Sequence, residues 1–135
     1  MIIDQELLNH LSDEARKNSR LRASFDLRNS TEDLSQRMLN AIEPGTVIPI
    51  HRHQHSSETL IIIRGKLREF LYDESGALDK VVEMEAGGTC TIMQIEKGQW
   101  HSLECLKSGT IIFEAKDGPY MPISAEDILD NKIEE

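Results

Sequence analysis

The chain has 135 residues, a length that suits one domain with a single hydrophobic core. Its hydrophobic content of 39% and charged content of 29% are those of a folded globular protein, which excludes a largely disordered chain. The 24 acidic and 15 basic residues give a formal net charge of −9 with no basic stripe, and this charge argues against nucleic acid or an anionic membrane surface as a partner.

The first elements in chain order are a helix and a strand. Residues 5–17 are predicted to form an amphipathic helix that Asp4 caps at its N-terminus. The apolar stripe of this helix consists of Leu7, Leu8, Leu11 and Ala15. Segment 20–28 alternates apolar odd positions with polar even positions, which predicts a half-buried strand.

Short strands separated by turn residues account for most of the remaining chain. They are predicted over residues 37–42, 47–53, 58–64, 67–72, 78–84, 90–95, 100–106 and 110–115. Pro49 within the second of these indicates an edge position or a bulge. Strands this short, evenly spaced and rich in Ile, Val, Thr and Leu favour an all-β barrel or sandwich. Ser124 with Asp127 resembles a capping box that opens a short terminal helix.

One group of residues is a candidate metal site. His51 and His53 are two apart on a predicted strand, so both side chains leave the same face. Glu58 follows across a turn, and His101 begins a later strand. Three imidazoles and one carboxylate suit zinc, iron, nickel, copper or manganese better than calcium or magnesium. The alternative is that these histidines are exposed or hydrogen-bonded one by one.

The spacing of these residues resembles the first motif of the cupin superfamily. Five residues separate Gly45 from His51-Arg52-His53, four more precede Glu58, and six more precede Gly65. Every defined position of that motif is matched. The resemblance implies a cupin barrel with a metal ion bound by the two histidines and the glutamate.

The second cupin motif is matched in part by the segment EKGQWHSLEC. Gly98 and His101 are in place, but Glu96 stands where proline is usual and Cys105 where asparagine is usual. The first departure reduces the rigidity of a turn and keeps the metal ligand. The second could change a wall of the pocket.

Flanking segments resemble the WbuC family of cupin-fold metalloproteins. The resemblance includes the leading helix, the strand RLRASFDLR, the segment QRMLNAIEPGT and the closing EAKDGPY. It implies an association with surface-polysaccharide gene clusters, and cupins in general are commonly homodimers. We therefore expect one all-β domain over residues 1–135, a single cupin barrel (double-stranded β-helix or jelly roll) with a short helix at each end. Its parts are a helical appendage at 1–19, the barrel at 20–116 and a tail at 117–135.

Other residues have both a functional and a structural interpretation. Glu114 and Tyr120 are the candidates for a general acid or base. The structural alternative is a surface ion pair of Glu114 with Lys116 and a tail anchor at Tyr120. Lys116 is interpreted as a surface ion pair. Arg20 and Arg22, with Arg28, form the polar face of one strand. They would bind an anionic group if that face lines the pocket, and the default is that they only solubilise the protein.

Three further residues are given structural roles. His55 is interpreted as a solvated side chain or a residue near the metal ligands, and Cys105 as a small buried hydrophobe. Trp100, with a parity opposite to that of His101, is expected outside the barrel or at an interface.

The expected function is that of a metal-binding protein acting on a small molecule inside the barrel. One hypothesis is an enzyme, either a sugar isomerase or epimerase or a dioxygenase, and the alternative is a non-catalytic binding module. An enzyme requires a titratable group in the pocket beyond the metal ligands. No secretory pattern or membrane-spanning run is visible, and the two cysteines are read as reduced thiols, so a cytoplasmic location is expected.

Overall fold

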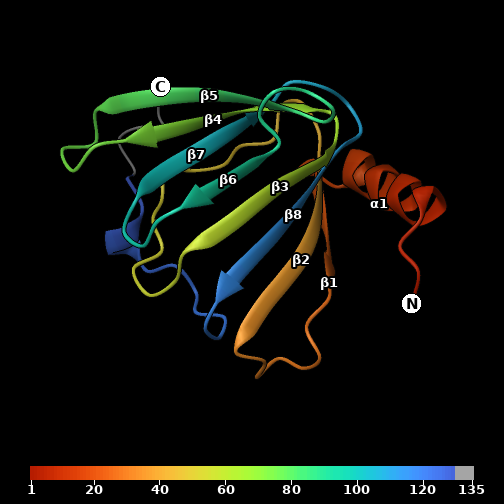
Figure 1. Cartoon of the computed structure of the whole chain (residues 1–135), viewed down its shortest axis with the longest axis horizontal. Coiled ribbons are helices and arrows are strands. Elements are labelled where there is room, and N and C mark those ends of the chain that lie inside the picture. Colours follow the sequence, from red (N-terminus) through yellow and green to blue (C-terminus); the bar gives the residue numbers. More distant parts are fainter. Residues whose placement is uncertain (130–135) are drawn as a thin grey trace.

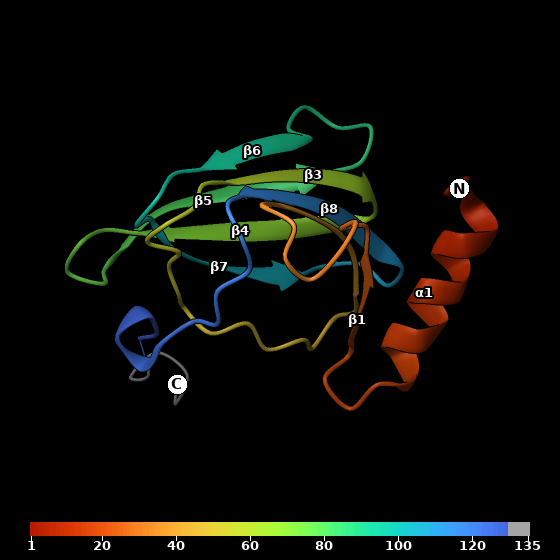
Figure 2. The same ribbon diagram turned by 90° about the horizontal axis from the view of Figure 1, so that it is seen from below.

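Two antiparallel sheets and one outlying helix make up the computed structural model, which describes residues 1–129 (Figure 1). The elements are α1 (Gln5–Lys17), β1 (Arg22–Asp26), β2 (Ser35–Ile42), β3 (Glu58–Arg64), β4 (Lys66–Tyr72), β5 (Leu78–Glu85), β6 (Ile92–Ile95), β7 (Trp100–Cys105), β8 (Thr110–Asp117) and the 3₁₀ turn η1 (Ala125–Asp127). The strand orders are β1-β2-β8-β3-β6 and β5-β4-β7. In a view from below, the chain between β2 and β3 runs across the side of the barrel (Figure 2). The all-β barrel expected from the sequence is confirmed.

The hydrophobic core between the sheets forms because inward positions on facing strands are apolar. Its buried members are Ile42, Leu60, Ile62, Leu67, Met84, Cys105 and Ile112. Cys105 is therefore a small buried hydrophobe, as expected. No described helix has the length and apolar character needed to cross a membrane. The last part of the predicted C-terminal tail, residues 130–135, lies outside the described residues.

Helix α1 covers the outer face of the first sheet. Its buried side chains pack with Leu39, Ala41 and Ile111, which confirms the predicted apolar stripe. The register of β3 against β8 shifts between Ile62 and Arg64, and the Arg64 side chain makes a second set of contacts with the helix. The Arg64 guanidinium donates to the Leu8 carbonyl at 3.3 Å and to Ser12 Oγ at 3.0 Å.

The N-cap of this helix gives a first prediction. The Asp4 side chain accepts a hydrogen bond from the Leu7 amide at 3.0 Å, so Asp4→Ala leaves that donor without a partner in the protein. We expect Asp4→Ala to lower the free energy of unfolding by about 1 kcal/mol. Asp4→Ser, which keeps an acceptor, should recover most of this loss in urea denaturation. Equal losses in the two variants would contradict a capping role.

Strand β1 has its apolar face outside the barrel and its polar face inside. Ala23 and Phe25 pack in the cluster beneath α1. Ser24, on the opposite face, donates through Oγ to Asn40 Oδ1 at 2.6 Å, and both residues line the barrel cavity. Arg20 and Arg22 line the same cavity, Arg22 half-buried and Arg20 exposed, so this face borders the pocket, which is the condition set for binding an anionic group. The helix buries the apolar face, which leaves the polar face to the interior.

The predicted strand at 47–53 is absent. The segment is irregular, and only His51 forms isolated bridges, to His101 and Ile128. Pro49 lacks a backbone donor and so cannot take part fully in a ladder. Hydrogen bonds to distant segments hold this stretch instead. The Arg52 amide donates to the Asp127 carbonyl at 3.1 Å.

The turn η1 is short and is not opened by a capping box. The Ser124 side chain makes no capping hydrogen bond, which corrects that prediction. The Asp127 carboxylate instead accepts from Arg52 Nε at 2.8 Å and from Gln54 Nε2 at 2.6 Å. Asp127 therefore ties the C-terminal segment to the two residues that flank His53.

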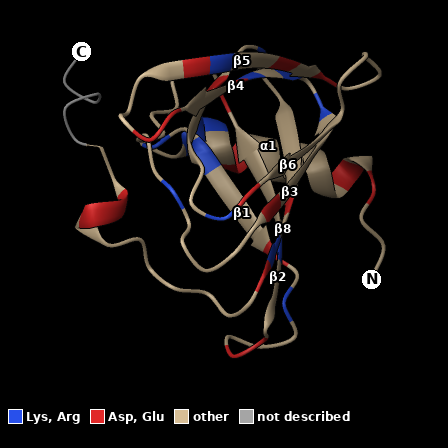
Figure 3. Ribbon diagram, turned by 60° about the vertical axis from the view of Figure 1, so that its left-hand side comes forward, with Lys and Arg blue, Asp and Glu red and all other residues tan. Residues whose placement is uncertain are grey.

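Charged side chains on the outer face of the second sheet pair with one another. Both acidic and basic residues occur along β4 and β5 (Figure 3). The Arg68 guanidinium lies 3.0 Å from a carboxylate oxygen of Glu83 and 3.4 Å from one of Glu104. The positive charge of Arg68 is therefore already paired with the carboxylates of Glu83 and Glu104.

Candidate metal centre

The three histidines converge although they come from different elements. The His51 amide donates to the His101 carbonyl at 3.0 Å, and the His101 amide donates back at 2.9 Å. This reciprocal pairing places the two ring centroids 4.3 Å apart, and the His53 ring lies 5.1 Å from that of His51. One ligand atom from each of the three residues lies within 4.8 Å of the others. The cluster could hold a metal ion.

Backbone carbonyls orient two of the rings. His51 Nδ1 lies 2.8 Å from the Pro49 carbonyl, and His101 Nδ1 lies 2.8 Å from the Gln99 carbonyl. A carbonyl oxygen only accepts, so each Nδ1 carries a proton, and Nε2 is the nitrogen left to ligate a metal when the ring is neutral. Such a second hydrogen bond is usual for a metal-ligating histidine. The tautomers of both rings therefore suit ligation through Nε2.

The third ring has a buried nitrogen with no partner. His53 Nε2 makes no hydrogen bond with any described residue, a costly arrangement for a buried polar atom. Burial lowers the pKa of His51 to about 3 and that of His53 to about 4, so both are neutral at neutral pH. Neutral imidazole is the form that binds a metal. These side chains fit a divalent transition metal.

Glu58 stands beside the three histidines at the start of β3. Its side chain is buried, with Oε2 3.6 Å from His101 Nε2 and Oε1 3.7 Å from Lys116 Nζ. Burial alone raises the pKa of Glu58. The contact with His101 and the Lys116 charge outweigh that effect and lower the pKa to about 2. The carboxylate is therefore ionised, as a metal ligand must be. Glu58 is not, however, a member of the cluster whose ligand atoms lie within 4.8 Å of one another, which consists of the three histidines.

Glu114 lies in the same cavity as the histidines, and Tyr120 does not. The cavity, of about 330 Å³, is lined by His51, His53, Glu58, His101 and Glu114 among others. Glu114 Oε2 accepts from Asn40 Nδ2 at 2.7 Å. Burial, and then the Glu58 charge, raise the pKa of Glu114 to about 7, so the group can exchange a proton near neutral pH.

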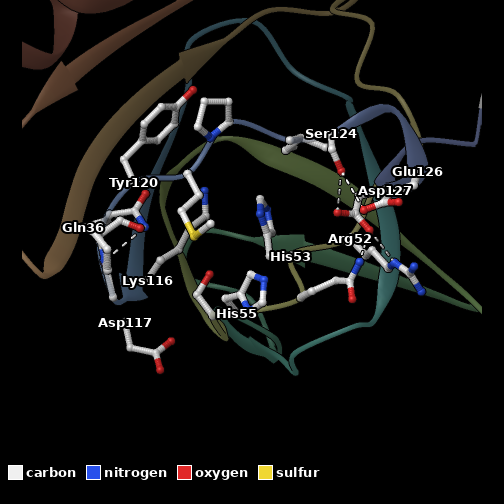
Figure 4. Close-up of a pocket in the computed structure, with 17 residues that line it drawn as sticks. Gln36, Arg52, His53, His55, Lys116, Asp117, Tyr120, Ser124, Glu126 and Asp127 are labelled. Atoms are coloured by element: carbon white, nitrogen blue, oxygen red, sulfur yellow. Dashed lines mark hydrogen bonds and ion pairs between the residues drawn. The ribbon is translucent and has the colours of Figure 1, made fainter.

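Tyr120 lines a second cavity of about 370 Å³ that shares His53 and Lys116 with the first. In Figure 4, His53 stands between Lys116 on one side and the Arg52–Asp127 pair on the other. Lys116, interpreted from the sequence as a surface ion pair, instead contacts buried Glu58. His55 is exposed in the second cavity, consistent with a solvated histidine.

Trp100 is buried, with the Arg52 guanidinium 4.4 Å from its ring centroid, and it is not a member of the core cluster between the sheets. The cation stacked on the ring fixes a residue adjacent to both His51 and His53. Trp100 therefore supports the segment that holds two of the candidate ligands.

Sequence reasoning missed Glu69, a carboxyl on the cavity wall with almost no exposure to solvent. Its Oε2 has no hydrogen-bond partner among the described residues. A signal was present, because Glu69 has the parity of Leu67 on β4, and Leu67 is a core residue. A carboxyl at an inward strand position is unfavourable for stability and is therefore a candidate for function.

Glu69→Gln gives a second prediction, for the metal-free protein. Burial, and then the charges of Glu58 and Glu114, raise the pKa of Glu69 well above its ordinary value of 4.5. The folded state therefore binds more protons than the unfolded state above pH 4.5. The stability contribution is complete below that pH and falls by up to about 1.4 kcal/mol per pH unit as pH rises towards the folded-state pKa.

Glutamine does not titrate, so the stability advantage of Glu69→Gln over wild type should increase from pH 4.5 to pH 8. Urea denaturation across this range measures it. Below pH 4.5 we expect no advantage, because the wild-type carboxyl is already neutral. A difference that does not change with pH would contradict the raised pKa.

Comparison with known structures shows the fold type of this chain. Its fold resembles oxalate decarboxylase from Bacillus subtilis (the E162A mutant), with a TM-score of 0.59 and 20% identity over 80% of this chain and 28% of that one. It also resembles recombinant oxalate oxidase in complex with glycolate, with a TM-score of 0.62 and 14% identity over 79% of this chain and 56% of that one. The chain thus spans about a quarter and just over half the length of these two proteins. The barrel is of the cupin type, as the sequence predicted.

The family is shown by the sequence itself. Residues 3–84 match the family described as "Domain of unknown function (DUF6016)", and the chain belongs to it. A search of curated proteins finds no match. Another structure of the Bacillus subtilis oxalate decarboxylase concerns its Mn(II) centres, a property of that protein.

Proposed function

We propose that this chain is a metal-dependent cupin enzyme that acts on a small molecule inside its barrel. The observation that carries the proposal is the convergence of three imidazoles and an ionised carboxylate on the wall of one cavity. His51, His53, His101 and Glu58 would hold the ion, which is zinc, iron, nickel, manganese or copper. When bound, such an ion supplies Lewis-acid chemistry or, in the case of iron, reactivity towards dioxygen.

The catalytic part of the proposal depends on the carboxyls that are not needed as ligands. Glu114 can hold or release a proton at a carboxyl oxygen in the cavity, while Asn40 fixes its orientation by donating to Oε2. Lys116 neutralises Glu58 from the other side. Apolar walls such as Leu60 and Ile112 exclude water from the reacting groups. Glu114 is thus the proposed general acid or base, and Tyr120 is not included.

The substrate and cellular setting complete the proposal. The resemblance of the flanking segments to the WbuC family supports a sugar or sugar-derived substrate in surface-polysaccharide metabolism, with isomerase, epimerase or dioxygenase chemistry. One domain over the whole chain, a homodimer and a cytoplasmic location are further parts of the proposal and rest on the sequence. The alternative, a non-catalytic binding module, is less favoured because the cavity contains Glu69 and Glu114 in addition to the metal ligands.

Elemental analysis tests the metal first. Protein purified without a metal-affinity step should contain close to one equivalent of a transition metal, and the double variant His51→Ala/His101→Ala should contain almost none. Substoichiometric metal that is unchanged in the double variant would refute the metal site.

NMR assays of metal-loaded protein with sugars and organic acids test catalysis. A turned-over substrate should lose at least about a hundredfold in rate with Glu114→Gln at unchanged metal content. Ligand binding without turnover in wild type would establish the binding module instead.

A further inference from the structure

The cavity that contains the candidate metal ligands extends well beyond them. Met38, Asn40 and Ile42 are successive inward positions of β2 and all line it, so it follows this strand for about 13 Å at 3.3 Å per residue. Arg22 pairs with Ile42 at one end of this path, whereas Glu58 pairs with Lys116 beyond the other. Arginine and the metal ligands therefore lie towards opposite ends of one cavity, whose volume suits a small molecule.

The arginines of the chain divide into two groups. Six of them have side-chain ion pairs or hydrogen bonds within the protein: Arg16, Arg28, Arg37, Arg52, Arg64 and Arg68. For Arg20 and Arg22 the described part of the chain offers the guanidinium no such partner. Both of these arginines line the cavity of the candidate metal centre. Arg22 is half-buried, whereas Arg20 is exposed at the edge of the cavity. A charged group such as Arg22 that is partly withdrawn from water without a partner is unfavourable unless a ligand supplies one.

The direction of the Arg22 side chain follows from its strand. Ser24 shares the face of Arg22 and reaches the cavity wall through its hydrogen bond to Asn40. Ala23 and Phe25 occupy the other face and pack beneath α1. Side chains two apart on a strand point to the same side, so Arg22 points to the interior. The guanidinium of Arg22 is therefore presented to the cavity and not to bulk solvent alone.

The carboxylates that share the cavity do not cancel this positive charge. Glu58 is already paired with Lys116 and His101. Glu114 accepts a hydrogen bond from Asn40, and neither it nor Glu69 forms an ion pair among the described residues. Burial raises the pKa of both, which decreases their negative charge near neutral pH. A chain with a net charge of −9 therefore has an unpaired, half-buried Arg22 in this cavity, with the exposed Arg20 at its edge.

We propose that Arg22, with Arg20, binds the anionic phosphate or carboxylate group of the small molecule whose other end reaches the metal ligands. The inference rests on the proposed function and specifies its substrate class. The substrate would be an elongated molecule with an anionic group at the Arg22 end and an oxygen-containing group at the end that reaches the metal ligands. The planar guanidinium suits either anion, because it offers two parallel N–H donors to two oxygens. The apolar side chains between the two ends would contact the carbon skeleton.

Two simple anions test the arginine site without the metal. Metal-free, ¹⁵N-labelled protein is titrated with inorganic phosphate and, in a separate arm, with succinate, at constant ionic strength. The arginine Nε–H signals are followed by NMR. We expect saturable shifts of the Arg22 signal with at least one anion, and the arm with the larger affinity identifies the class. Arg22→Gln should weaken that binding by at least about tenfold, the value of one charge-assisted hydrogen bond.

Arg68→Gln is the matched control, because it removes the same charge from the outer face of the second sheet, and it should bind both anions as wild type does. Equal affinity in wild type and in Arg20→Gln/Arg22→Gln, or no saturable binding by wild type, would overturn the inference. Zinc stoichiometry is measured in parallel. Normal zinc content with no anion binding refutes only the arginine site, and anion binding without zinc refutes only the metal site.

Discussion

Replacement of His101 by alanine is expected to abolish the thermal stabilisation that zinc or manganese gives to this protein. An ion that binds only the folded state at a thousand times its dissociation constant contributes about 4 kcal/mol. For a chain of this length that corresponds to a rise in Tm of roughly 10 °C. His101 is buried and has its Nε2 next to Glu58, so its loss removes one of the three converging imidazoles.

The measurement compares Tm with and without the ion in chelator-treated samples. His101→Ala and Glu58→Gln should show little or no rise, and the second variant keeps the volume of the side chain and so separates ligand loss from a cavity. His55→Ala is the matched control, since His55 is an exposed imidazole in the adjoining cavity. It should retain the full rise. An equal rise in His101→Ala and wild type would contradict the assignment of His101 as a ligand.

The candidate metal ligands could be predicted because most of them lie close together in the sequence. His51, His53 and Glu58 lie within eight residues, and their types and spacing indicate a metal site before any fold is known. The reason given from the sequence was nevertheless wrong in one respect. His51 and His53 converge without being on a strand, because backbone hydrogen bonds to His101 and Asp127 fix their segment. Bonds between residues 50 to 75 positions apart leave no local signature.

The rest of the cavity could not be predicted for a related reason. The alternation in residues 20–28 predicts that one face of β1 is buried, but it does not identify which layer buries it. The polar face lines the cavity only because α1 covers the apolar face, a result of tertiary packing. Lys116 was misinterpreted likewise, since its partner Glu58 belongs to a neighbouring strand. Of these residues, only Glu69 could have been recognised from the local sequence, because it lies two positions after the core residue Leu67 on the same strand.

Gly65→Ala is expected to be the most destabilising glycine-to-alanine change among the described residues. Gly65 has φ +88° and joins β3 in the first sheet to β4 in the second. An added Cβ would lie 2.7 Å from Thr110 Cα and 2.8 Å from Thr110 Cβ. Thr110 is fully buried and is held by its hydroxyl, which donates to the Lys107 carbonyl at 2.6 Å. Neither the backbone nor this side chain can yield at low cost.

Left-handed backbone strain and overpacking together should lower the free energy of unfolding by about 3–5 kcal/mol. Gly87→Ala is the control, because Gly87 has φ +76° but no atom within 4 Å of an added Cβ, so only the strain of about 1–2 kcal/mol applies. The difference between the two variants in urea denaturation measures the cost of the steric clash with Thr110. Equal losses of stability would contradict this clash. The glycine that ends the metal-site motif would then be explained by the close approach of β8 to the joint between the sheets, and not by contact with the metal.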